Sequence, residues 1–302
     1  MKEISVKDRA EAIRYLKLVF RTRRVDDDQV SIQRFEDGIS NKNYLVTFSD
    51  EETKYCLRIP GYGSEGMVDR LDEKTNNLLA CEMGITPEVY YFDGKNGVKV
   101  VRYVEGAETL HADTIRKPEN MEQIAKILRT LHSKMVRFHK DFNVFTEIYR
   151  YEHLLSNVNG EMYDGYYEVR SKVLKLEQRF NKLGIRVTPC HCDTLAENWL
   201  KGKDGAITLL DWEYSGMNDP FWDITAPFIE DDFTPEEEAY FLSAYFDGSV
   251  PNDASERVLY YKILMDYLWS IWARVKELDG ATDLREYGMM RLNRGLNNLK
   301  LV

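Results

Sequence analysis

The spacing of apolar residues changes near residue 105, and this change constrains the fold more than any other feature of the chain. Before it, short segments that are apolar, or that alternate apolar with polar residues, are bounded by Gly, Asn or Asp, which is typical of β-strands. Strands are expected at Val30–Phe35, Tyr44–Phe48, Lys54–Ile59, Glu88–Phe92 and Val98–Tyr103, and one helix at Met67–Glu82. The first hundred residues therefore predict a small β-rich lobe.

After Glu105 the apolar residues recur every three or four positions, as they do on one face of an α-helix. Helices are expected at Met121–His139, Tyr166–Phe180, Pro235–Phe246 and Glu256–Leu278. We therefore predict an α+β protein of two lobes, a small β-rich N-lobe over residues 1–104 and a larger helical C-lobe over residues 105–302. A cleft between two such lobes is a common place for a ligand.

A short β-rich segment interrupts the helical half. Val187–His191 is expected to be a strand, and Asn198–Leu200 and Ile207–Leu210 are expected to be the two arms of a hairpin. The turn between these arms, Gly202-Lys203-Asp204-Gly205, has residues that hairpin turns favour. The loop after the strand and the end of the hairpin both hold polar residues that could act together.

The charge and the cysteines exclude several classes of protein. A formal net charge of −10 without clustered Lys or Arg argues against a nucleic-acid partner and is compatible with a cationic substrate. No apolar stretch has the length of a membrane span, and the first residues lack the pattern of a signal peptide. The cysteines form neither a disulfide framework nor paired zinc ligands, which indicates a reducing cytoplasm.

The segment His191–Asn198 has the residues that phosphoryl transfer requires. Asp193 and Asn198 stand five positions apart in a loop after the expected strand, and Asp211 follows the hairpin 13 residues after Asn198. One Asp can orient and deprotonate an attacking hydroxyl, while an Asn and a second Asp can hold Mg²⁺ on the triphosphate of ATP. We therefore expect Asp193 to be the catalytic base and Asn198 and Asp211 to be metal ligands. The alternative is that Asp193 caps the loop and Asn198 belongs to a turn.

Two other motifs suggest different chemistry. Gly61-Tyr62-Gly63-Ser64-Glu65-Gly66 fits GxGxxG, but Pro60 precedes it and the later segments indicate a meander rather than a βαβ unit. Cys190-His191-Cys192 could bind zinc, yet its spacing strains chelation and a second ligand pair is missing, so burial at a strand end is the simpler interpretation. The chain has no GxxxxGKS/T motif, which excludes a P-loop enzyme.

The segments HCDTLAENWL (191–200) and LLDWEYSGMNDPFWDIT (209–225) resemble the bacterial choline/ethanolamine kinase family, within the aminoglycoside-phosphotransferase group. The resemblance extends to Asp37–Tyr44, Leu57–Gly61 and Asp69–Glu73, and it covers most of residues 35 to 290. It implies a two-lobed protein-kinase-like fold and an ATP-dependent kinase whose acceptor is an alcohol.

The resemblance implies a role for each matching residue. Asp193 matches the catalytic base, Asn198 and Asp211 match the metal ligands, and Glu213 matches an acid near the substrate. The residues implied in ATP binding are Ser40, Asn41 and Lys42 in the phosphate-covering turn, Arg58 with its helix partner Glu73, and Tyr103 and Val104 beside the adenine. A guanidinium such as that of Arg58 can fork onto phosphate oxygens. Two alternatives stay open, namely a plain surface ion pair of Arg58 with Glu73, and Lys54, on the same strand face, as the phosphate contact.

Trp269 and Trp272 stand three positions apart on an expected helix and therefore share a face. Aromatic faces bind quaternary ammonium groups, and the family has a Trp-x-x-Trp of this kind near its C-terminus. The resemblance adds Tyr287 to the same acceptor site. The alternative is that the two tryptophans belong to the core, which is the more frequent role of such a pair.

Together these residues predict a cytoplasmic enzyme that transfers the γ-phosphoryl group of ATP, with Mg²⁺, to the hydroxyl of choline. Ethanolamine, an aminoglycoside or another amino alcohol is the alternative acceptor, and a catalytically silent kinase-like binding module is the alternative of a different class. Asp219 and Asp223 are expected to stabilise the metal loop or cap a helix that begins near Ile224, and His132 to hydrogen-bond around the catalytic segment. The oligomeric state and the number of Mg²⁺ ions stay open.

Overall fold

The computed structural model describes residues 4–22, 25, 29–35, 41–61, 68–157, 160–278, 280 and 284–302. Contacts between residues divide the chain into two compact units. The N-terminal unit is Met1–Leu110 with Glu197–Ser215, and the C-terminal unit is His111–Ala196 with Gly216–Val302. The lobe boundary predicted after residue 104 stays a prediction, and the compact units differ from it by grouping the segment 197–215 with the N-terminal residues.

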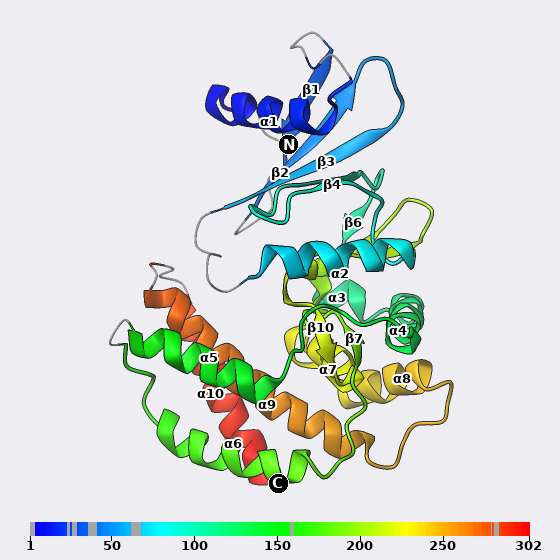
Figure 1. The fold of residues 1–302 in the computed structure, drawn as a ribbon. Coiled ribbons are helices and arrows are strands. Elements are labelled where there is room, and N and C mark those ends of the chain that lie inside the picture. Colours follow the sequence, from blue (N-terminus) through cyan, green and yellow to red (C-terminus); the bar gives the residue numbers. More distant parts are fainter. Residues whose placement is uncertain are drawn as a thin grey trace. The chain divides into compact units, whose positions relative to one another are not determined.

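An antiparallel sheet of five strands forms the centre of the N-terminal unit, in the order β1-β2-β3-β5-β4 (Figure 1). Its strands are β1 (Val30–Arg34), β2 (Asn41–Phe48), β3 (Lys54–Pro60), β4 (Val89–Phe92) and β5 (Lys99–Arg102). All five expected strands are confirmed, although β2 begins at Asn41 rather than at Tyr44. Because side chains alternate along a strand, Leu57 and Arg58 of β3 leave the sheet on opposite faces.

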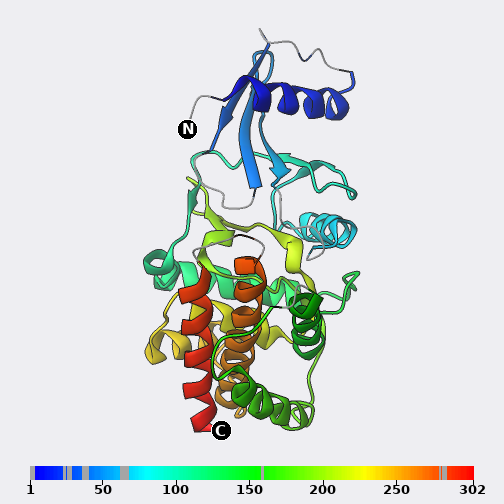
Figure 2. The ribbon, with the colours of Figure 1, turned by 90° about the vertical axis from the view of Figure 1, so that its left-hand side faces the viewer.

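Helix α1 (Val6–Val19) covers one face of this sheet (Figures 1 and 2). Ser5 caps the helix, because its hydroxyl accepts a hydrogen bond from the N–H of Asp8 at 3.1 Å. Ala12 and Leu16 are fully buried in a core that includes Leu57 of β3. The sequence analysis did not predict this helix, because charged residues interrupt its apolar positions.

Helix α2 (Arg70–Glu82) brings polar residues into the interior of the N-terminal unit. It begins after its N-cap Asp69, whose side chain accepts hydrogen bonds from two backbone N–H groups, and it buries Glu73 and Asn76. The expected helix over Met67–Glu82 is confirmed from Arg70 onward, and Met67 lies outside the described residues. A helix with a buried carboxylate on its inner face needs cations nearby.

The predicted hairpin is confirmed in the same unit. Its arms β8 (Trp199–Lys201) and β9 (Ile207–Leu209) form a three-stranded sheet with β6 (Glu108–Thr109), and Gly205 supplies the left-handed turn position at φ +82°. The 3₁₀ turn η2 (Trp212–Tyr214) follows. The side-chain amide of Asn76 donates to the carbonyl oxygen of Ser215 at 3.1 Å, so the chain after the hairpin is attached to α2.

The C-terminal unit is mainly helical and is built around α9 (Ala254–Leu278), a helix of 25 residues. The remaining elements are α3 (Ala112–Ile115), α4 (Pro118–Ser133), α5 (Val144–Asn157), α6 (Tyr166–Phe180), α7 (Pro220–Glu230), α8 (Pro235–Tyr245), α10 (Arg285–Asn298), the turn η4 (Leu299–Leu301), and the paired strands β7 (Thr188–Cys190) and β10 (Gly216–Asn218). The turn η1 (Ala196–Asn198) begins at the last residue of the segment His111–Ala196 of this unit and continues into the N-terminal unit. Helices α5, α6, α7 and α10 pack against α9, and α10 lies beside it in both ribbon views (Figures 1 and 2). In the described part of the chain, no helix has both the length and the apolar character needed to cross a membrane.

The prediction of one helix over Met121–His139 is wrong at its C-terminal end. Helix α4 stops at Ser133, and Lys134 has extended backbone angles (φ −72°, ψ 135°). Met135 is consequently fully exposed, although its spacing placed it on the apolar face. Phe138 lies in the non-helical segment after α4, and its side chain is buried. Its N–H donates to the sulfur of Met217 at 3.2 Å. Helices α5 and α10 were not expected as separate elements.

Candidate active site

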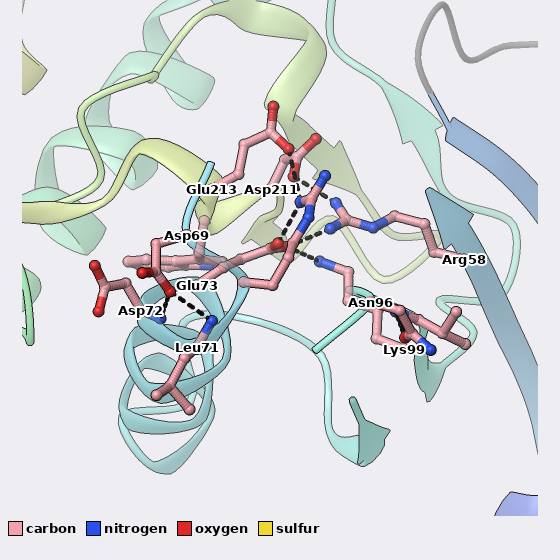
Figure 3. A network of polar contacts seen from close by, with 12 residues as sticks. Arg58, Asp69, Leu71, Asp72, Glu73, Asn96, Lys99, Asp211 and Glu213 are labelled. Carbon is pink, nitrogen blue, oxygen red and sulfur yellow. Dashed lines mark hydrogen bonds and ion pairs between the residues drawn. The ribbon is translucent and has the colours of Figure 1, made fainter. Parts of the chain in front are cut away.

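Glu73 is the centre of a buried ion cluster in the N-terminal unit (Figure 3). Arg58 of β3 and Lys99 of β5 stand directly opposite each other, so their side chains leave the sheet on the same face. Oε1 of Glu73 accepts a hydrogen bond from Arg58 Nη2 and lies 3.4 Å from Lys99 Nζ. Its Oε2 lies 2.6 Å from Arg70 Nη1. A single carboxylate therefore holds three cations together.

This cluster is not a surface ion pair. The side chains of Arg58 and Glu73 are 7% and 0% exposed, which excludes that alternative. Burial alone would raise the pKa of Glu73, but Arg58 and Lys99 lower it below its ordinary value. Burial and the neighbouring Arg58 also lower the pKa of Lys99. The charges of the cluster thus keep Glu73 ionised.

Asn198 and Asp211 stand at the open end of the hairpin β8–β9. The N–H of Leu210 donates to the carbonyl oxygen of Asn198 at 2.8 Å, which brings Asp211 next to the strand position of Asn198. Asp211 has a left-handed φ of 59°, a conformation that is uncommon outside Gly and is concentrated at functional sites. Its Oδ1 lies 2.5 Å from Arg58 Nη1, and its side chain is 30% exposed. A partly exposed carboxylate and an amide that flank the hairpin strands supply the oxygen donors that Mg²⁺ prefers.

Glu213 lies at the edge of the same cluster. Its Oε2 is 3.2 Å from Arg70 Nη1. Burial and the negative charge of Asp211 raise the pKa of Glu213 to about 7. The sequence analysis included Glu213 but missed Arg70 and Lys99 as members of the site. Lys99 could have been noticed as a charged residue in an otherwise apolar strand, whereas its position opposite Arg58 depends on strand register.

The residues expected in the phosphate-covering turn are described in part. Ser40 lies outside the described residues, and Asn41 begins β2 opposite Pro60. Nζ of Lys42 lies 2.8 Å from Oδ1 of Asp8 on α1. The role of these residues in ATP binding stays a prediction.

Lys54, the alternative phosphate contact, forms its ion pair with Glu105 at the other end of β3 from Arg58. Both partners of this pair are exposed, at 39% and 53%. Arg58 is instead bound to Glu73 and Asp211, the helix acid and one of the expected metal ligands. The ion pairs therefore favour Arg58 as the cation of the site.

Tyr103 and Val104 follow β5. The N–H of Tyr103 donates to the carbonyl oxygen of Lys54 at 2.9 Å, and its ring stacks on Phe35 with the centroids 6.0 Å apart. A cleft of about 190 Å³ is lined in part by Tyr103 and Lys54. The backbone of this segment is thus fixed beside an open cleft, and its contact with adenine stays a prediction.

In the C-terminal unit, Asp223 of α7 holds the loop that carries Asp193. Its carboxylate accepts hydrogen bonds from the N–H groups of His191 at 2.7 Å and Cys192 at 2.8 Å, and Nε2 of His132 lies 3.0 Å away. Asp223 is fully buried, and a buried carboxylate is stable only with such partners. The structural role expected for His132 is confirmed, whereas Asp223 holds the loop of Asp193 rather than the metal loop or the start of a helix.

Further hydrogen bonds hold the loop before and after Asp193. The indole Nε1 of Trp222 donates to the carbonyl oxygen of Cys192 at 3.0 Å, and Oγ1 of Thr194 donates to the carbonyl oxygen of Asp223 at 2.7 Å. Cys192 has a left-handed φ of 67°, so the backbone is strained immediately before Asp193. Asp193 is thus presented by a loop that is fixed on both sides.

Asp219, rather than Asp223, caps the helix. Its side chain accepts a hydrogen bond from the N–H of Phe221 at 3.0 Å, and α7 begins at Pro220. The expected helix start near Ile224 is therefore wrong by about one turn. Pro is favoured at the first helical position after a capping Asp, which is the signal that locates this start.

His132, Cys190 and Asp223 have ligand atoms within 4.8 Å of one another, close enough to hold a metal ion. Both ring nitrogens of His132 are already hydrogen-bonded, Nδ1 to the hydroxyl of Tyr245 at 2.8 Å and Nε2 to Asp223 at 3.0 Å. The sulfur of Cys190 donates to the carbonyl oxygen of Asn218 at 3.4 Å. These hydrogen bonds explain why the three side chains lie close together. Of the sequence triplet Cys190-His191-Cys192 that was considered for zinc, Cys190 alone belongs to this group of ligand atoms. All three residues of the triplet are buried.

The rings of Trp269 and Trp272 meet edge to face, with centroids 6.1 Å apart and an interplanar angle of 87°. Both side chains are half-buried, whereas Tyr267 on the same helix is fully buried. A tryptophan pair that only filled the core would be covered like Tyr267. The exposure of this pair therefore favours contact with a ligand.

Tyr287 of α10 is also half-buried. Burial raises the pKa of Tyr287, and the negative charges of Glu230, Asp266 and Asp193 raise it further. The ring therefore lies within electrostatic reach of the expected catalytic base. The sequence analysis missed Glu230 and Asp266. The acidic run that begins at Glu230 was a visible signal, but Asp266 stands within a helix and only its contacts distinguish it.

The fold and the site together define a class of protein. A five-stranded antiparallel sheet, a helix Glu paired with a strand cation, and a catalytic-loop Asp followed by an Asn and a second Asp are the parts of a protein-kinase-like phosphotransferase. The chain is therefore a phosphotransferase with a kinase-like fold.

The chain belongs to the choline/ethanolamine kinase family, whose profile matches residues 32–294. It is 31% identical to protein LicA of Haemophilus influenzae over 268 residues, which are 85% of this chain and 76% of that protein. It is 26% identical to ethanolamine kinase 2 of Mus musculus over 298 residues, 88% of this chain and 75% of that one. The family membership makes the protein an ATP-dependent kinase with an alcohol as acceptor.

Two solved structures agree with this assignment. The crystal structure of choline kinase LicA from Streptococcus pneumoniae has a TM-score of 0.83 and 34% identity, covering 98% of this chain and 100% of that one. A structure of LicA in complex with AMP has a TM-score of 0.79 and 34% identity, covering 95% and 97% of the two chains.

Proposed function

We propose that this kinase phosphorylates the hydroxyl group of choline to give phosphocholine. The observation that supports this acceptor most directly is the half-buried pair Trp269 and Trp272 in the unit that holds Asp193 and the half-buried Tyr287. Aromatic faces attract a quaternary ammonium through their quadrupole. The charges of Asp193 and Glu230 near Tyr287 favour a cation as well. The similarity to a choline kinase of known structure supports the same acceptor.

The nucleotide is proposed to bind in the N-terminal unit. Arg58 would contact the phosphates, with Asn41 and Lys42 covering them, and the backbone at Tyr103 and Val104 would lie beside the adenine. The buried position of Arg58 and its bond to Asp211 support the phosphate contact. The AMP complex of a related protein supports a nucleotide site in this fold.

Asn198 and Asp211 would hold Mg²⁺, which supplies positive charge to the triphosphate when bound. Asp193 would accept the hydrogen bond of the choline hydroxyl and then its proton, as the hydroxyl oxygen forms its bond to the γ-phosphorus and the bond from that phosphorus to the bridging oxygen of ATP breaks, so that ADP leaves. The fixed loop around Asp193 keeps its carboxylate in one orientation during this step. Glu213 is proposed to lie near the acceptor and to adjust the charge of the site.

Ethanolamine is the second candidate acceptor, because ethanolamine kinases are among the relatives. A primary ammonium donates three hydrogen bonds and needs acceptors for them, whereas a quaternary ammonium donates none. The rings of Trp269 and Trp272 offer aromatic faces rather than hydrogen-bond acceptors, and this favours choline.

An acceptor series tests the proposal. Release of ADP would be measured with choline, ethanolamine, an aminoglycoside and 3,3-dimethylbutan-1-ol, the neutral isostere of choline. We expect choline to have the highest kcat/KM and the isostere a much lower one, because only the charge differs between them. Turnover of ethanolamine without turnover of choline would reject the acceptor assignment.

A silent binding module makes a different prediction in the same series. It would bind AMP in calorimetry and release no ADP with any acceptor.

The proposal also places the enzyme in the cytoplasm, where its four cysteines would stay free thiols as they are in the structure.

A further inference from the structure

Two arginines and two carboxylates form a buried network where α9 meets α10. Arg291 is 1% exposed, with Nη1 2.7 Å from Oε1 of Glu230 and Nε 2.9 Å from Oδ1 of Asp266. Arg294, the next turn along α10, places Nε and Nη2 at 2.9 and 2.8 Å from the two oxygens of Asp266. Arg294 therefore forks onto Asp266, and its Nη1 donates to the carbonyl oxygen of Ile229 at 3.0 Å. Arg291 instead joins Asp266 to Glu230.

This network also supports the ring of Tyr287. Tyr287 and Arg291 are four positions apart on α10 and share a face. The guanidinium carbon of Arg291 lies over the ring, 5.4 Å from its centroid. Gly295 lets α10 approach α9 closely, because a Cβ at this position would lie 3.3 Å from the Cβ of Asp266 on α9. The position of the Tyr287 ring thus depends on a cation that is itself held from the neighbouring helix.

Glu230 depends on the same cation. Its side chain is 20% exposed, and its Oε1 is occupied by Arg291. Burial raises the pKa of Glu230, and Arg291 opposes this shift. The negative charges of Glu230 and Asp193 both raise the pKa of Tyr287, so both carboxylates lie within electrostatic reach of this ring.

We propose, on the basis of the function proposed above, that Arg291 is a positioning residue for a cationic acceptor. It supports one face of Tyr287 and holds one oxygen of Glu230, so that the ring and the carboxylate meet the quaternary ammonium in a single arrangement. Its own charge would repel the acceptor, so its contribution is geometric. Together with Arg294 it balances the charges of Glu230 and Asp266.

The matched variants are Arg291→Met and Arg294→Met, because both arginines bind Asp266 and the cation over the ring of Tyr287 is that of Arg291. We expect Arg291→Met to raise the KM and the calorimetric Kd for choline about tenfold, with the KM for ATP within about twofold of wild type. Arg294→Met should leave both values within about twofold of wild type.

Two further variants keep the proposal testable if Arg291→Met does not fold. Arg291→Lys keeps the positive charge but loses the planar, forked guanidinium. It should raise the KM for choline several-fold while the circular dichroism spectrum stays normal. The double variant Glu230→Gln/Arg291→Met should lose less affinity than the sum of the single losses, because both residues act on one arrangement.

Unchanged affinity for choline in a folded Arg291→Met or Arg291→Lys overturns the proposal. Equal losses for choline and ATP, or the same loss in Arg294→Met, also overturn it. A wild-type protein that binds no choline would instead reject the proposed function and leave the contacts of Arg291 to be tested with the acceptor that it does bind.

Discussion

The guanidinium of Arg58 donates a hydrogen bond to Asp211 across 2.5 Å, so the candidate phosphate ligand and a candidate metal ligand are partners of each other. The same guanidinium is bound to Glu73 on its other side. A nucleotide phosphate bound by Arg58 would therefore compete with Asp211, and Mg²⁺ bound by Asp211 would compete with Arg58. Binding of the two is expected to be coupled through this pair.

The variant Asp211→Asn tests this coupling. Removal of the carboxylate charge releases Arg58 and reduces repulsion of the phosphates, so ADP in the presence of EDTA should bind more tightly by about 1 kcal/mol, or roughly fivefold. Added Mg²⁺ should no longer strengthen binding. Calorimetry with and without Mg²⁺ measures both effects, and Glu105→Gln, which removes an exposed acid, is the control. Weaker binding of ADP in EDTA would contradict the coupling.

Glu73→Gln should destabilise the N-terminal unit strongly. The substitution leaves Arg58, Arg70 and Lys99 close together without their shared counter-charge, and breaking a buried ion pair of this kind costs about 3–5 kcal/mol. Urea unfolding followed by circular dichroism measures the loss. Glu88→Gln, which breaks a pair that is about half exposed on both sides, should leave the midpoint unchanged. Similar midpoints for the two variants would show that the cluster contributes little.

The stability difference between the wild type and Glu73→Gln should depend on pH. Because the pKa of Glu73 is lowered from its ordinary value of 4.5, its contribution is complete above pH 4.5 and is lost as the pH falls through the lowered pKa. The difference in unfolding free energy should therefore shrink as the pH is lowered from 6 toward 3. A difference that stays constant over this range would mean that Glu73 remains ionised throughout or that its charge is unimportant.

Asp193→Asn should lower kcat by about 10²–10⁴-fold, the usual contribution of a positioned general base. The amide keeps the shape of the side chain, and Asp223 and Trp222 hold the loop. Affinity for AMP should therefore match that of the wild type. Release of ADP and calorimetry measure the two quantities, and near-normal turnover would end the assignment of Asp193 as the base.

Trp269→Leu and Trp272→Leu should each raise the KM for choline, by roughly tenfold if a desolvated cation–π contact is lost. The KM for ATP should stay at the wild-type value, because these residues belong to the C-terminal unit. Steady-state kinetics with choline and the neutral isostere measure the effect. The isostere should lose less, since it has no charge for the rings to attract, and equal losses for both would indicate packing alone.

Elements with a regular period of their own were predictable from the sequence. The two-residue alternation in Lys54–Pro60 and the helical spacing in Tyr166–Phe180 appear in the structure as β3 and α6. The end of α4 was not predictable, because residues 134–139 keep an apolar spacing while Phe138 is drawn to Met217, 79 positions away. The local spacing of apolar residues cannot predict a contact between two residues so far apart in the chain.

The candidate site divides in the same way. The order of the loop Asp193–Asn198, the hairpin and Asp211 can be read from the sequence, because turn residues and motif spacing are local properties. The placement of Lys99 opposite Arg58, and of three cations around Glu73, depends on strand register and on the docking of α2. The attachment of the catalytic loop to Asp223, and of Arg291 to Glu230 and Asp266, depends on which helix faces pack together. The sequence by itself determined the chemistry that is available, and the contacts between distant segments decided which charged groups share one environment.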